Sequence, residues 1–140
     1  MRNIDMIVIH CSDSAFGNAA LINKWHIDQG WRKIGYHYVI LNAYPDPDHH
    51  KSKRLDRDSD GFIETGREIE AVGSHAKGHN KNSIGICLIG TDSFTGLQMN
   101  RLVSLCSYLI HTYDIKIDPV LRAGEIVSGI VGHNELNSDK

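Results

Sequence analysis

The sequence predicts an α/β fold, with a single mixed β-sheet at the centre and amphipathic helices on its faces. Two observations predict it. The segments 6–9 and 83–90 are short runs that are apolar on both alternating faces, which is typical of central strands covered on both sides. The segments 19–29 and 95–113 repeat apolar residues at three- and four-residue steps, which is typical of helices packed on such a sheet.

Length and composition narrow the possible classes of protein. A chain of 140 residues is about one domain, so we expect residues 1–140 to form a single domain. The net charge of -2, with mixed signs, shows no basic stripe for nucleic acid. An odd count of three cysteines argues against a disulfide framework. No apolar run approaches the roughly 20 residues of a membrane span, and the start leaves no room for a signal peptide. We expect a soluble monomer, made in the cytoplasm.

The first strand predicts where a polar side chain will lie. Residues 6–9 are apolar and His10 follows them, so His10 is expected at the strand end, in a cleft walled by loops. By itself, a histidine there is more often a core residue bonded to backbone. Asn18 is a suitable N-cap for the helix at 19–29, and Gly30 a suitable stop.

Residues 36–41 form a second predicted strand, rich in β-forming residues. Its alternation predicts one face with Tyr36, Tyr38 and Ile40 and another with His37, Val39 and Leu41.

Residues 42–60 change in composition and are predicted to be an exposed insertion. Three aspartates that precede Gly61 match the front half of a calcium-binding loop: Asp56, Asp58 and Asp60. The twelfth position of such a loop is Arg67 where a glutamate is needed, so an ordinary Asp-Gly turn is favoured over calcium. The adjacent His49 and His50 are predicted to be solvated loop residues.

Residues 64–82 are predicted to form a loop with several glycines and polar side chains, which can adapt to the shape of a ligand. A central strand is predicted at 83–90, and a helix capped by Thr95 follows it. Its predicted core stripe is Met99, Leu102, Val103, Cys106, Leu109, Ile110 and Tyr113. Residues 114–129 are poorly patterned and contain Pro119. A final β-like run, 130–132, ends on His133 as the first strand ends on His10.

Four motifs in this order carry a resemblance to a known family. They are His10 after a strand, GYHYVI at 35–40, VGSHAKGHN through NSIGICL at 72–88, and VGH at 131–133. Together they resemble the type 2 N-acetylmuramoyl-L-alanine amidases, a family that includes zinc amidase lysozymes of bacteriophages and peptidoglycan recognition proteins. The resemblance spans nearly the whole chain and implies the mixed-sheet fold of that family.

The resemblance implies a zinc site and its catalytic partners. His10 and His133 would be two zinc ligands, Tyr36 would stand beside the metal, and Lys140 would stabilise the tetrahedral intermediate. The bond cut would be the amide between N-acetylmuramic acid and L-alanine in peptidoglycan. Ser74, His75 and Asn82 are expected to contact the substrate, although His75 fits a loop histidine bonded to backbone equally well.

One part of the family pattern is missing. The third zinc ligand, a Cys or Asp, is expected two positions past Lys140, where this sequence ends. Neither Cys11 nor Asp139 is a suitable substitute, so we expect the C-terminal end of the domain to lie beyond the sequence. Three function classes follow: a lytic cell-wall amidase of a phage or prophage, a muropeptide-binding module with an incomplete metal site, and a regulatory protein-binding partner. A cytoplasmic amidase that recycles muropeptides is a variant of the first.

Overall fold

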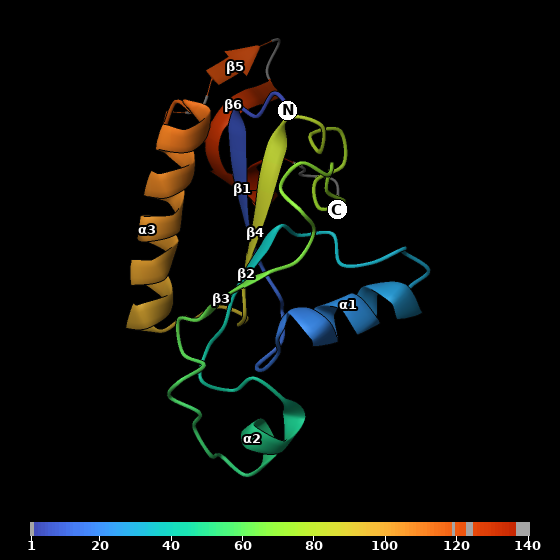
Figure 1. The fold of residues 1–140 in the computed structure, drawn as a ribbon, viewed down its shortest axis with the longest axis vertical. Coiled ribbons are helices and arrows are strands. Elements are labelled where there is room, and N and C mark those ends of the chain that lie inside the picture. Colours follow the sequence, from blue (N-terminus) through green and yellow to red (C-terminus); the bar gives the residue numbers. More distant parts are fainter. Residues whose placement is uncertain (1, 119, 123–124, 137–140) are drawn as a thin grey trace.

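The computed structural model describes residues 2–118, 120–122 and 125–136. Within this part of the chain, six strands form one sheet in the order β3-β2-β4-β1-β6-β5 (Figure 1). The strands are β1 (Met6–Cys11), β2 (Tyr38–Ile40), β3 (Ile63–Thr65), β4 (Ser83–Leu88), β5 (Val120–Arg122) and β6 (Glu125–Gly132). The helices are α1 (Ala19–Asp28), α2 (Pro47–Lys51), α3 (Gly96–Tyr113) and α4 (His133–Leu136).

The sheet is mixed, as predicted. The four inner strands β2, β4, β1 and β6 run parallel, and the edge strands β3 and β5 are antiparallel to their neighbours. The register aligns His10 with Cys87 on β4 and Ile9 with Gly132 on β6. Because parallel strands end at the same edge, the carboxyl ends of β1, β4 and β6 meet there.

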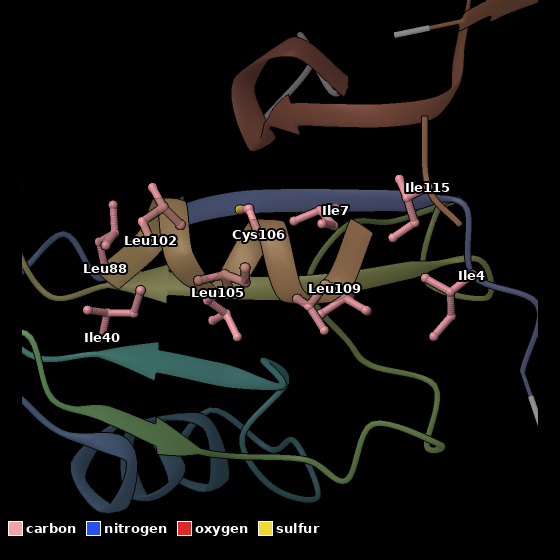
Figure 2. Packing of buried hydrophobic residues seen from close by; sticks show 11 residues of the cluster. Ile4, Ile7, Ile40, Leu88, Leu102, Leu105, Cys106, Leu109 and Ile115 are labelled. Atoms are coloured by element: carbon pink, nitrogen blue, oxygen red, sulfur yellow. The ribbon is translucent and has the colours of Figure 1, made fainter. Parts of the chain in front are cut away.

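Helices cover both faces of the sheet, and Figure 1 shows α3 and α1 on opposite sides. On the α3 face, one apolar cluster joins Ile7, Ile84 and Ile86 to Leu105 and Leu109 (Figure 2). The other face carries an apolar cluster beneath α1 and a smaller one beside α4. All six residues of β4 are buried, which confirms its prediction as a central strand.

The caps of the two long helices were predicted correctly. Asn18 Oδ1 accepts a hydrogen bond from the Leu21 N–H at the start of α1. Thr95 and Gln98 form a reciprocal capping box at the start of α3.

The predicted core stripe of α3 was wrong at two positions. Met99 is 43% exposed and Val103 is 68% exposed, whereas Gln98 is fully buried. The Gln98 side-chain amide donates to the backbone oxygens of Ile40 and Ile89. A polar residue thus joins the first turn of α3 to the ends of β2 and β4. These contacts orient α3 so that Gln98, Leu102, Leu105 and Leu109 face the sheet.

The predicted alternation is confirmed within 38–41, but it was wrong for Tyr36. The strand begins at Tyr38, and His37 lies at a bend before it. Tyr36 therefore packs with Val39 and Leu41 on the α1 face, while Tyr38 packs on the α3 face. Period-two alternation holds only within a continuous strand, and the bend breaks it.

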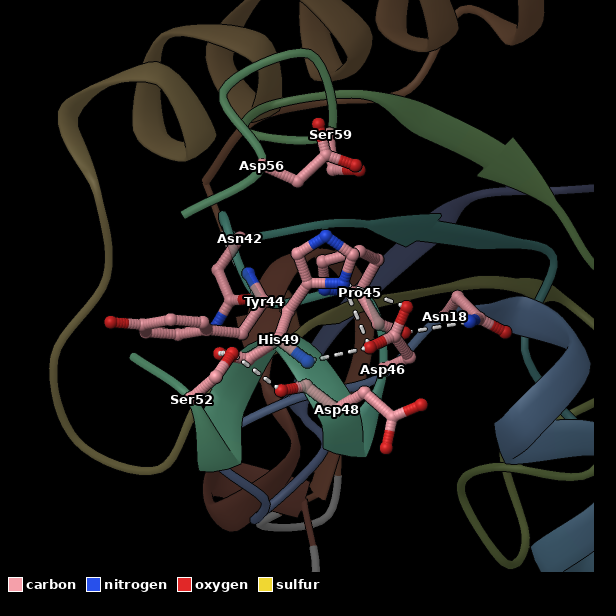
Figure 3. A network of polar contacts seen from close by, with 10 residues as sticks. All are labelled: Asn18, Asn42, Tyr44, Pro45, Asp46, Asp48, His49, Ser52, Asp56 and Ser59. Carbon is pink, nitrogen blue, oxygen red and sulfur yellow. Dashed lines mark hydrogen bonds and ion pairs between the residues drawn. The ribbon is translucent and has the colours of Figure 1, made fainter. Parts of the chain in front are cut away.

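Residues 42–60 contain a helix that was not predicted. Asp46 caps α2 and bonds the backbone and ring nitrogens of His49, while Asn18 donates to the Pro45 oxygen (Figure 3). His49 and His50 are half-buried on this helix, so their prediction as solvated loop residues was wrong. Two aspartates of the suggested calcium loop have side-chain partners within the protein: Asp56 accepts from Asp58 N and Ser59 Oγ, and Asp60 accepts from Thr95 Oγ1.

The segment 114–129, for which no strand was predicted, contains β5 and most of β6. The prediction placed the last strand at 130–132, so its first half was missed. Across the described ranges, no helix is long and apolar enough to cross a membrane.

Candidate functional site

Two histidines meet at the carboxyl edge of the sheet. His10 is the penultimate residue of β1 and is only 7% exposed. His133 follows directly after β6, which pairs with β1. Their ring centroids lie 4.6 Å apart, with 37° between the planes. The structure thus brings together two imidazoles that are 123 positions apart in the chain.

Tyr36 stands beside this pair. Its ring centroid lies 4.9 Å from that of His10. Burial raises the pKa of the Tyr36 hydroxyl above its ordinary value, so the group stays protonated, and it is hydrogen-bonded to the Cys87 thiol. A protonated phenol next to the histidines can donate a hydrogen bond to an oxygen of a ligand.

His75 supports His10 through a contact between their ring nitrogens. Nδ1 of His75 lies 2.9 Å from Nε2 of His10, and Nε2 of His75 lies 3.2 Å from Ser83 Oγ. Burial lowers the pKa of His75 to about 3, so its imidazole is neutral at pH 7. A Cβ on Gly85 would lie 2.7 Å from the His75 ring, so the space for this ring depends on a glycine.

Two further buried histidines position the segment that carries Tyr36. Nδ1 of His26 accepts from the Gly35 N–H, and its ring lies 5.5 Å from that of Tyr36. Nδ1 of His37 accepts from the Gly85 N–H, so its Nε2 carries the proton and donates to the Ala71 oxygen at 2.8 Å. Burial lowers the pKa of both histidines, that of His37 to about 4.

The role of His26 was not predicted from the sequence. The available signal was its position four residues after Ile22, on the buried side of α1. Its link to Tyr36 depends on how the loop after α1 folds back, which periodicity does not reveal.

These groups open into a cleft of about 620 Å³. The lining is mixed in character and includes Cys11, Trp31, Ser74, Thr91 and Phe94 beside His10, Tyr36, His75 and His133. Ser74 is exposed, and its backbone N–H donates to the Gly35 oxygen. The cleft is therefore an accessible hollow in which several histidines meet.

One predicted site residue, Asn82, is not brought to the cleft. Asn82 precedes β4 at the opposite edge of the sheet, where its side chain donates to Asp5 Oδ1 and its oxygen accepts from the N–H groups of Asp5 and Met6. Lys140 lies outside the described residues, as does any ligand expected beyond it.

The donor set fits part of a zinc site. Neutral imidazoles are preferred zinc ligands, and a ligating histidine normally bonds a neighbour through its other nitrogen, as the contact of His10 with His75 allows. Within the described ranges, no three His, Cys, Asp or Glu side chains are arranged to hold a metal ion. Among the described residues, His10 and His133 are the candidates for two of the ligands of such a site.

Comparison with known proteins gives concordant matches. The family model of N-acetylmuramoyl-L-alanine amidase, Amidase_2, matches residues 1–140. The endolysin of Escherichia phage T7 is 40% identical over 133 residues, which cover 87% of this chain and 75% of that protein. The endolysin of Enterobacteria phage T3 is 39% identical over 130 residues, which cover 85% of this chain and 73% of that protein.

Solved structures share the fold. The N-acetylmuramoyl-L-alanine amidase LysC from Clostridium intestinale superposes with a TM-score of 0.73 at 28% identity, over 97% of this chain and 74% of that one. Wild-type Drosophila PGRP-LB superposes with a TM-score of 0.68 at 22% identity, over all of this chain and 74% of that one, which shows the shared fold alone.

Proposed function

We propose that this member of the N-acetylmuramoyl-L-alanine amidase family uses one zinc ion to cleave peptidoglycan. The chain belongs to that family and is an amidase. The bond cut is the amide between N-acetylmuramic acid and L-alanine. The observation that carries this proposal is the approach of His10 and His133 to a 4.6 Å ring separation beside Tyr36.

His10 and His133 would hold the zinc ion. Zinc, when bound, supplies a Lewis acid that polarises the amide carbonyl and makes water more nucleophilic at neutral pH. His10 is rigidly placed because it belongs to β1 and contacts His75. In the family pattern the third ligand is a Cys or Asp two positions past the catalytic lysine.

Tyr36 would stabilise the oxyanion that forms on the scissile carbonyl. Its hydroxyl keeps its proton, and its partner in the structure is the thiol of Cys87, a weak acceptor. A developing negative charge is a much stronger acceptor and would draw this hydroxyl toward the substrate. Lys140 would supply a second donor, an ammonium group.

Ser74 and His75 would line the substrate path, because both belong to the cleft. His75 also keeps His10 in place, so we propose for it both a lining and a supporting role. We assign no substrate contact to Asn82, which lies at the opposite edge of the sheet.

The endolysin relatives suggest a biological setting. We propose that the protein is a lytic enzyme of a phage or prophage and acts on the bacterial cell wall. Rapid release of peptides from intact sacculi supports this setting, whereas activity restricted to soluble muropeptides points to recycling.

Digestion of purified peptidoglycan tests the chemistry. The expected products are peptides with a new L-alanine amino terminus and glycan strands that keep the lactyl carboxylate. A chelator should abolish release, added zinc should restore it, and His10→Ala and His133→Ala should each lower zinc content as well as activity. Retention of peptidoglycan without cleavage would instead identify a binding module.

Cleavage that persists in a chelator with no zinc in the protein would overturn the zinc proposal while leaving the amidase activity intact. Tyr108→Ala, on the exposed side of α3, is the control that should keep both zinc and activity.

A further inference from the structure

A second hollow adjoins the cleft. It has a volume of about 440 Å³ and is lined by two segments, residues 42–55 and 90–95, together with Ala15. Thr91 and Phe94 line both this hollow and the histidine cleft. The two spaces are therefore neighbours that share one wall, and a polymer bound in the cleft can extend into the hollow.

The topology sets the direction of this extension. His10 lies at the end of β1, and His133 follows β6. Thr91 follows β4, and Asn42 follows β2. The cleft and the hollow thus lie along the carboxyl edge of four parallel strands. Two strand spacings separate β1 from β2, which is roughly 10 Å. That distance leaves room beside the scissile bond for one further unit of a polymer.

The wall formed by residues 42–55 is fixed by internal contacts. Asn42 donates to the Ala15 oxygen and accepts from the Tyr44 N–H. The Tyr44 and His50 rings meet edge to face at 5.3 Å. The Ala43 oxygen accepts from the Asp56 N–H, which ties the two ends of the segment together. Residues 42–55, which belong to the segment of changed composition at 42–60, therefore form an ordered wall of this hollow.

The chemistry of the lining favours a neutral, hydroxyl-bearing ligand. Tyr44 and Phe94 present aromatic surface, and Asn42, Thr91 and Ser93 offer amide and hydroxyl groups. Among the described lining residues, Asp92 is the single carboxylate and no lysine or arginine is present. His50 is the single basic side chain among these lining residues, so a peptide with charged side chains and a terminal carboxylate would find few ionic partners here.

We propose that this hollow is a subsite for the sugar that adjoins the cleaved N-acetylmuramic acid, and that residues 42–55 make the enzyme selective for glycan length. The inference rests on the proposed function, because it places the scissile amide in the adjoining cleft. The sugar ring would pack against Tyr44, and its hydroxyl and acetamido groups would bond Asn42 and Thr91.

Matched soluble substrates test the proposal. One carries N-acetylmuramic acid alone, a second carries the disaccharide with the same stem peptide, and a third carries the single sugar with a shortened stem. For the wild-type protein we expect kcat/KM about 10-fold higher for the disaccharide than for the single sugar, the size of one good aromatic contact. Tyr44→Ala should bring this ratio close to one, and Tyr44→Phe should keep most of it.

A ratio between two substrates measured on one preparation is insensitive to the fraction of folded protein. Tyr108→Ala, on the exposed side of α3, should leave the ratio at its wild-type value. A wild-type ratio of one, or a ratio that Tyr44→Ala does not change, overturns the sugar subsite. Rates that depend on stem length, and respond to Tyr44→Ala in that comparison, would assign the hollow to the peptide. If none of the substrates is cleaved, the failure lies with the amidase function itself.

Discussion

Both faces of the central sheet carry apolar clusters, but the face opposite α3 also carries buried histidines. The α3 face is a continuous apolar cluster that includes Ile7, Ile86 and Leu109. The opposite face carries His10 in line with Met6 and Val8, and His75 stands over Gly85. His26 and His37 lie buried on the segments that pack there.

The α3 face therefore contributes mainly to the stability of the fold, and the histidine face mainly to the positioning of side chains at the site. Apolar burial on the α3 face contributes free energy of folding without regard to direction. On the histidine face, directional hydrogen bonds fix the rings around Tyr36 and His10, and buried polar groups stabilise little beyond their own desolvation. We therefore expect substitutions on the α3 face to change stability, and substitutions on the histidine face to change activity more.

Leu109→Ala should produce the largest effect. Leu109 is fully buried, so the substitution leaves a cavity and should cost about 2–5 kcal/mol in the free energy of unfolding. Chemical denaturation measures this, and kcat/KM below the unfolding transition should stay near the wild-type value. Val103→Ala, at a position 68% exposed on the same helix, should change stability by less than about 0.5 kcal/mol. Equal losses at both positions would contradict the assignment of the α3 core.

Tyr36→Phe should show the opposite pattern. Loss of one donor to a developing oxyanion should lower kcat by about 10²-fold, while the free energy of unfolding changes little because the thiol partner is weak. Steady-state kinetics on a soluble muropeptide measures the effect. Tyr38→Phe is the matched control, since Tyr38 packs on the α3 face. Full activity of Tyr36→Phe would remove Tyr36 from the mechanism.

His37 should make the protein less stable in acid. Its pKa is lowered from 6.5 to about 4, by burial first and then by the charges of Arg2 and Arg67. The unfolded chain therefore binds the proton more readily, and stability falls as the pH drops from about 6.5 toward 4. The expected loss from this group between pH 7 and pH 5 is roughly 2 kcal/mol.

Denaturation curves in the presence of a chelator measure this loss without a contribution from metal release. His37→Asn should flatten the pH dependence over this range. An unchanged dependence in the variant would mean that other groups cause it.

Thr95→Ala should have the smallest of these effects. The Thr95 hydroxyl accepts from the Gln98 N–H and donates to Asp60, so its removal should cost about 1 kcal/mol of stability. Thermal unfolding detects such a change. Thr112→Ala, at an exposed site within the same helix, is the control that should stay within about 0.5 kcal/mol. Equal stability of Thr95→Ala and the wild type would show that the cap contributes nothing measurable.

Much of the α3 face could be predicted from the sequence, because apolar periodicity reports directly on burial. Cys106 and Leu109 were placed correctly in this way. Val103 was not, because the buried Gln98 orients the helix through two backbone oxygens from distant strands. A polar residue at a core position gives no apolar signal, so only the folded chain reveals it.

On the histidine face, the sequence predicted which residues lie at the strand ends, but it did not predict the contacts between their side chains. The positions of His10 and His133 at strand ends followed from the apolar runs that precede them. The support of His10 by His75, and that of the Tyr36 segment by His26, follows from loops that fold back over the sheet. The ordered wall at residues 42–55 was likewise not predictable, since a short helix and ring contacts replace the expected exposed loop.

Local patterns of residue type were enough to predict the alternation of strands and helices, the central place of β1 and β4, and the family. Which side chains meet depends on the folded chain: the strand order β4-β1-β6 brings His10 and His133 together, and the bend at His37 turns Tyr36 toward them. The physical reason is that local pattern fixes which residues are buried, whereas the register and order of strands fix their neighbours in space.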